Sequence, residues 1–92
     1  MDYQKYIISI AADGIVPKEE PKALDKLVER FGNIQQAFGS PWYLNQDGID
    51  EKIYFARSSK PLEQQEIDKL EAAFKKEHRT LKIFRLEDIM KN

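Results

Sequence analysis

Residues 5–11 carry the sequence KYIISIA, a β-branched run that is apolar at most positions. Such a run is typical of an interior strand whose two faces are both partly covered. In an extended chain Tyr6, Ile8 and Ile10 fall on one side. We therefore expect this segment to lie inside a sheet, with its neighbouring strands supplied by later parts of the chain.

Two amphipathic helices are predicted between the strands. The first is marked by four apolar residues at the i, i+3, i+4 and i+7 spacing of one helical stripe. These residues are Leu24, Leu27, Val28 and Phe31. Gly32 follows them, where a left-handed helix cap belongs. In the second helix Ile67, Leu70 and Phe74 line the core side, and the sequence SSKP at 58–61 is expected to open the helix with a serine cap.

Residues 34–44 and 52–56 predict a hairpin of two strands, separated by the turn sequence NQDG at 45–48. The sequence GSP at 39–41 interrupts the first of them. Because proline cannot donate to a strand ladder, this strand is expected to be bent, bulged or at an edge of the sheet. A last strand is predicted over 81–86.

The order of these patterns is β-α-β-β-α-β, which predicts a ferredoxin-like α+β fold. In that plan a four-stranded antiparallel sheet carries two helices on one face. The first and third strands are central, and the second and fourth are at the edges. The other sheet face is left open, and we expect a function to reside there. Residues 1–92 are expected to form one such domain.

The composition fits a soluble globular protein with a highly charged surface, since 41% of residues are hydrophobic and 34% are charged. A net charge of −1 argues against general nucleic-acid binding but permits a local basic patch. The chain has no cysteine, which excludes disulfides and thiolate metal sites and suits a cytoplasmic location. No apolar run approaches the roughly 20 residues of a membrane span, so no membrane partner is expected.

The charged residues of the predicted strands are basic with the exception of Glu51, whereas acidic residues lie mainly on helices and loops. The basic residues are Lys5, Lys52, Arg57, Lys82 and Arg85. A sheet face that held some of them beside Tyr54 and Phe84 would combine cations with aromatic rings, as nucleic-acid platforms do. Alternatively, strand lysines keep an open face solvated and discourage edge aggregation, or the face is a dimer interface.

Three further positions invite interpretation. Trp42, beside Tyr43, is either an anchor for a partner or part of the core. His78 is the one histidine of a chain without cysteine, so we expect a solvated residue near a helix end rather than a zinc ligand. Asp13 precedes Gly14 at the end of the first strand. It is either a turn residue or, in a dimer, one of two carboxylates that share a magnesium ion.

Four segments carry a resemblance to a known group of proteins. They are YIISI at 6–10 with a following aspartate, FG at 31–32, FGSPWYLN at 38–45 and LKIFRLED at 81–88. With these segments the chain resembles small ferredoxin-like proteins that include CRISPR spacer-acquisition nuclease-like proteins, VapD-like ribonucleases and the antitoxin GhoS. The resemblance implies a homodimer that contacts RNA or DNA. In the nuclease branch it implies a metal ion at Asp13.

The first functional hypothesis is a small non-catalytic regulatory module without a cofactor. It would act through its open sheet face or an edge strand on a protein partner or a second copy of itself, as a regulator, antitoxin or phage-type inhibitor does. The candidate binding residues are Lys5, Trp42, Tyr43, Lys52, Tyr54, Lys82, Phe84 and Arg85. The alternatives are a Mg²⁺-dependent ribonuclease that uses Asp13 and an RNA-binding platform that uses the lysines and Tyr54.

Overall fold

The structure is a computed structural model that describes residues 4–13, 20–44 and 50–90, including their side chains except at 37–44, 50 and 90. The elements in chain order are β1 (Gln4–Ala12), α1 (Leu24–Phe31), β2 (Asn33–Leu44), β3 (Asp50–Ser58), α2 (Gln64–Lys75), β4 (Arg79–Arg85) and α3 (Leu86–Met90). The first six follow the order β-α-β-β-α-β, which confirms the predicted plan.

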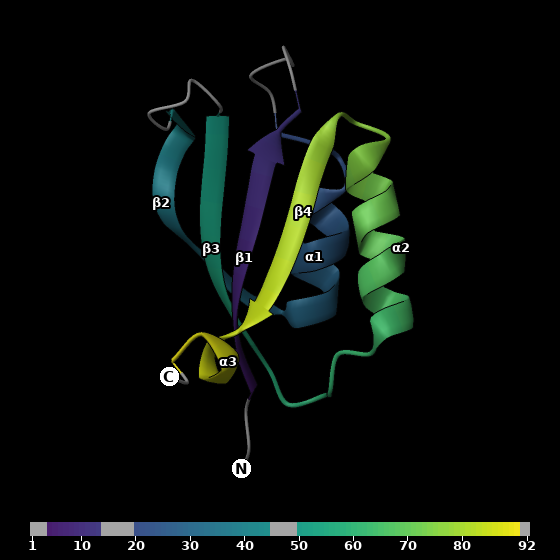
Figure 1. The fold of residues 1–92 in the computed structure, drawn as a ribbon. Helices are drawn as coiled ribbons and strands as arrows, with labels where there is room; N and C mark the ends of the chain where they lie inside the picture. Colours follow the sequence, from purple (N-terminus) through teal and green to yellow (C-terminus); the bar gives the residue numbers. More distant parts are fainter. Residues whose placement is uncertain (1–3, 14–19, 45–49, 91–92) are drawn as a thin grey trace.

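The strands form one sheet in the order β2-β3-β1-β4, and every neighbouring pair is antiparallel. β1 is therefore central, as its apolar sequence predicted, and β2 is at an edge. The β2 ladder shifts register between Gln36 and Phe38 and again between Phe38 and Tyr43. These irregularities confirm the bulged edge strand that was predicted from its internal proline. Figure 1 shows α1 and α2 on the same side of the sheet.

The hydrophobic core lies between the sheet and these two helices. Its buried members include Tyr6, Ile8 and Ile10 of β1, Leu27 and Phe31 of α1, Leu70 and Phe74 of α2, and Leu81 of β4. The rings of Tyr6 and Phe31 lie 5.4 Å apart at an interplanar angle of 59°, a tilted arrangement that aromatic pairs favour. The predicted helical stripes therefore face the sheet, except at Val28, which is exposed.

The N-terminus of α1 is stabilised by a residue that follows α2. The Glu77 carboxylate accepts hydrogen bonds from the backbone N–H groups of Lys22 and Ala23, at 2.9 and 2.8 Å. Burial raises the pKa of Glu77, but these two bonds and the charges of Arg79 and Lys22 lower it more, so the net shift is downward. At its other end α1 stops at Gly32 with φ +67°, the left-handed cap that was predicted.

The second helix begins later than the sequence suggested. α2 starts at Gln64, and Glu63 and Glu66 form a reciprocal capping box there. Ser58 is instead the buried last residue of β3, and its hydroxyl accepts a hydrogen bond from the Lys60 N–H at 3.1 Å. The prediction that a serine caps this helix is therefore wrong, because Glu63 is placed to bond the first free N–H groups of the helix.

Arg30 connects α1 to the segment that leads into α2. Its Nε donates to Glu66 Oε2 at 2.5 Å, and its Nη1 donates to Ser58 Oγ at 3.0 Å. Its Nη2 donates to the carbonyl oxygens of Lys60 and Pro61 at 3.1 and 3.0 Å. The hydrogen bond from Arg30 is the main reason that the pKa of Glu66 lies below its usual range. One guanidinium thus joins both helices and the end of β3.

Candidate binding face

The sheet face that points away from α1 and α2 carries an apolar row across three strands. Cross-strand partners in an antiparallel sheet project to the same side. Ile7 of β1 pairs with Phe55 on β3 and with Phe84 on β4. Phe55 is 49% exposed and Phe84 is 44% exposed, whereas the next residue of β1, Ile8, is 0% exposed. We call Phe55, Ile7 and Phe84 the apolar row, and this side of the sheet the open face.

Cations lie on both sides of the apolar row. Lys5 pairs with Arg57 on one side, and Lys82 pairs with Ser9 on the other. Lys5, Arg57 and Lys82 are all exposed. Among the described strand residues of this face, the acidic one is Glu51. Its Oε2 accepts a hydrogen bond from Ser9 Oγ at 2.7 Å. This part of the open face is therefore positive, although the whole chain has a net charge of −1.

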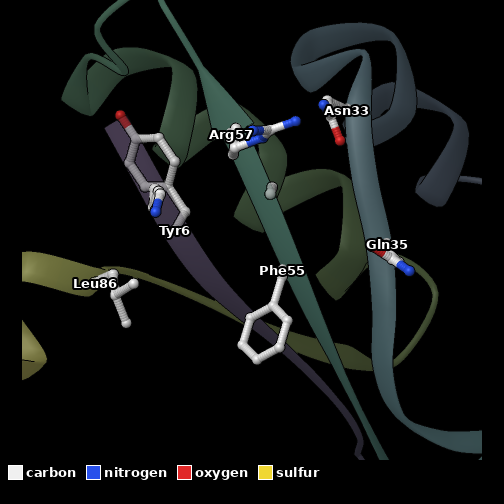
Figure 2. Close-up of a pocket in the computed structure, with 8 residues that line it drawn as sticks. Tyr6, Asn33, Gln35, Phe55, Arg57 and Leu86 are labelled. Carbon is white, nitrogen blue, oxygen red and sulfur yellow. The ribbon is translucent and has the colours of Figure 1, made fainter. Parts of the chain in front are cut away.

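A groove of about 330 Å³ lies where the apolar row approaches α3. It is lined by Lys5, Tyr6, Asn33, Gln35, Phe55, Ala56, Arg57 and Leu86. Figure 2 shows the Phe55 ring projecting from β3 on the side where Leu86 lies, and the Arg57 side chain directed toward Asn33. The groove thus offers an aromatic ring, two amides and two cations within a volume that suits a small organic group.

Two of the predicted binding residues are on the opposite side of the sheet. Lys52 pairs with Ile10 and Tyr54 pairs with Ile8, so both project toward the helices. Lys52 is 2% exposed and Tyr54 is 6% exposed. The prediction that they share the open face with other strand lysines is wrong. The Lys52 ammonium is compensated by an ion pair with Glu20, which precedes α1, so this cation does not need to face solvent.

The position of Tyr54 gives a pH-dependent prediction. Burial, with a smaller contribution from the charge of Glu20, raises the pKa of Tyr54 from 10.0 to about 12. Because the folded protein holds this proton more tightly, the stabilisation is full below pH 10.0 and is lost as the pH rises toward 12. The tyrosinate absorbance of Tyr54, taken as the difference between wild type and Tyr54→Phe, should therefore appear near pH 12. In denaturant it should appear near pH 10.0. A transition of the folded protein near pH 10.0 would contradict the burial of Tyr54.

The remaining predicted binding residues lie outside the apolar row or outside the described side chains. Arg85 is the exposed last residue of β4, and its guanidinium approaches Glu87 at 3.7 Å and Asp88 at 3.8 Å. Such surface pairs stabilise little. Trp42 and Tyr43 belong to β2, but their side chains are not among those described. Their proposed role as anchors therefore stays a prediction.

A backbone hydrogen bond connects Asp13 to His78. Asp13 is exposed at the end of β1, and its N–H donates to the His78 carbonyl at 2.8 Å. His78 is exposed in the turn before β4, with a φ of 60°. Within residues 4–13, 20–44 and 50–90, no three His, Cys, Asp or Glu side chains gather where they could hold a metal ion. The hypothesis of a magnesium ion shared by two Asp13 carboxylates stays a prediction.

The same architecture occurs in a solved structure, that of an ACT domain protein from Streptococcus pneumoniae. The two match with a TM-score of 0.59 at 11% sequence identity, over 97% of each chain. This chain has a ferredoxin-like fold of the ACT type. At this identity the likeness shows the fold alone, and the finer resemblance to the CRISPR, VapD and GhoS proteins is not shown by it. No family model and no curated protein matches the sequence.

None of the helices in the described ranges is both long enough and apolar enough to span a bilayer.

Proposed function

We propose that this protein is a small non-catalytic regulatory module of the cytoplasm that binds a macromolecular partner on its open face. The observation that carries the proposal is the apolar row, in which two phenylalanines remain about half exposed on either side of Ile7. Phenylalanine normally contributes to a core, and a contiguous exposed apolar patch with a polar rim is typical of an interaction site. Aromatic residues also dominate the binding energy of many interfaces.

The charges around the apolar row favour an anionic partner. Lys5, Arg57 and Lys82 flank the row, and in a complex of two open faces these cations would lie close to the same cations of the second copy. Such like-charge contacts oppose association. We therefore assign any homodimer to a different surface, such as an exposed edge of the sheet, and reserve the open face for a partner of another kind.

The test compares what three forms of the protein capture from an extract of the source cell. In the first variant, Phe55→Ser and Phe84→Ser together remove the exposed rings. The control, Val28→Ser, removes an apolar side chain that is 47% exposed on α1. Wild type and the control should capture the same partner, and the double variant should lose it by roughly 30-fold or more, as the loss of interface hot spots does. Equal capture by all three forms would overturn the proposal.

A further inference from the structure

Taking the proposed function as its basis, we propose that the partner of the open face is a single-stranded nucleic acid whose bases stack on Phe55 and Phe84. Both rings belong to the open face and are 49% and 44% exposed, so a flat base can reach them. Base stacking on exposed aromatic side chains is the general means by which antiparallel sheet surfaces bind single strands. The rings therefore provide two stacking positions on one surface.

The spacing of the rings favours a single strand over a duplex. Phe55 and Phe84 pair with the same residue, Ile7, from opposite sides. Their strands are therefore two strand spacings apart, roughly 9–10 Å. Two bases that stack on these rings must be separated from one another, and only an unpaired strand can splay its bases in this way.

The cations are placed for the phosphates that connect such bases. Lys5 and Arg57 lie on one side of the apolar row, and Lys82 lies on the other. A strand that crosses the row therefore meets positive charge before and after the stacking positions. The charge of −1 on the whole chain excludes broad attraction to nucleic acid, so the attraction is confined to this face.

The groove beside Phe55 adds a means of contacting the edge of a base. Its lining includes the side-chain amides of Asn33 and Gln35, next to the Phe55 ring. Each amide carries both a donor and an acceptor, which is the combination that base edges present. A purely apolar peptide segment would leave these amides without partners. The groove therefore favours a base over an aliphatic side chain.

Conservative variants distinguish stacking from ordinary apolar contact. Phe55→Leu and Phe84→Leu keep an apolar side chain but remove the flat ring, whereas Phe55→Tyr keeps the ring. The probes are fluorescein-labelled random RNA and random single-stranded DNA of roughly 12 nucleotides, followed by fluorescence anisotropy with the full chain. Each leucine variant should weaken binding about tenfold, and Phe55→Tyr should weaken it by less than Phe55→Leu does because the ring is kept.

Salt and charge variants test the phosphate contacts. With three cations, affinity for a single strand should fall about 20-fold between ~50 and ~200 mM salt. Lys82→Gln should weaken binding and reduce this salt dependence. Lys26→Gln removes an exposed cation of α1 and should change neither. A preference for RNA over DNA would indicate contacts to the 2′-hydroxyl, and equal binding would indicate that bases and phosphates suffice.

Two results would overturn this inference: absence of binding to both single strands, or leucine variants that bind as wild type does. Either result is separate from failure of the proposed function. If the cell-extract capture still depends on Phe55 and Phe84, the open face binds a protein instead of a nucleic acid. If the capture is independent of both residues as well, the open face is not the binding surface.

Discussion

Phe74→Ala is expected to lower the free energy of unfolding by about 3–5 kcal/mol. Phe74 lies on α2, is 0% exposed and belongs to the cluster of buried residues between the sheet and the helices. Its removal leaves a cavity that the surrounding side chains fill only in part. Because small domains have a total stability of only about 5–15 kcal/mol, this loss is a large fraction of the whole.

The matched control is the same substitution on the other side of the sheet. Phe55→Ala removes the same atoms from a residue that is 49% exposed, so it should cost less than about 1 kcal/mol. Urea unfolding followed by circular dichroism measures both values. A cost at Phe55 equal to that at Phe74 would mean that Phe55 is buried in the folded protein. The assignment of the open face would then fail.

The order of the elements and the course of α1 could be predicted from the sequence because local patterns determine them. The run at 5–11 is apolar at most positions, which is typical of an interior strand, and the structure places it in the centre of the sheet. The apolar stripe that includes Leu27 and Phe31 has the period of a helix, and Gly32 ends it. In both segments the spacing of the apolar residues favours one kind of secondary structure.

The face assignment of β3 could not be predicted in the same way. The two sides of this strand each carry an aromatic residue, Tyr54 on one side and Phe55 on the other. A lysine is normally expected in solvent, which favoured placing Lys52 and therefore Tyr54 on the open face. The buried Lys52 ammonium is compensated by an ion pair with Glu20, a residue 32 positions away in the sequence. A contact at that separation leaves no local pattern.

The candidate site was predicted only in part for a related reason. Lys5, Lys82 and Phe84 were recognised as open-face candidates because they are basic or aromatic residues on predicted strands, and the structure places all three on the open face. The groove beside Phe55 was missed, because its walls come from different elements. Gln35 belongs to the edge strand and Leu86 to the last helix, and only the folded chain brings them to one place. The role of Phe55 was missed because Tyr54, and not Phe55, was expected to project from β3 to the open face.

Arg30→Ala is expected to cost about 2–3 kcal/mol, because it removes several hydrogen bonds from a guanidinium that is largely shielded from water. The Arg30 side chain is 13% exposed, and its bond to Glu66 is charge-assisted. The bonds to the Lys60 and Pro61 carbonyls hold the segment between β3 and α2. Arg30→Lys should restore less than half of the loss, since an ammonium group cannot reproduce the planar arrangement of donors.

The pH dependence of this loss separates the contribution of Glu66 from that of the carbonyls. The pKa of Glu66 is lowered from its ordinary value of 4.5, chiefly by the hydrogen bond from Arg30. Its contribution is therefore present above pH 4.5 and is lost as the pH falls through the lower folded-state value. In urea unfolding, the difference between wild type and Arg30→Ala should be largest near neutral pH and should shrink below about pH 4. It should not vanish, because the carbonyl bonds do not titrate. A difference that is independent of pH would show that Arg30 stabilises the fold without Glu66, and a difference below about 0.5 kcal/mol at neutral pH would show that it does not join the two helices at all.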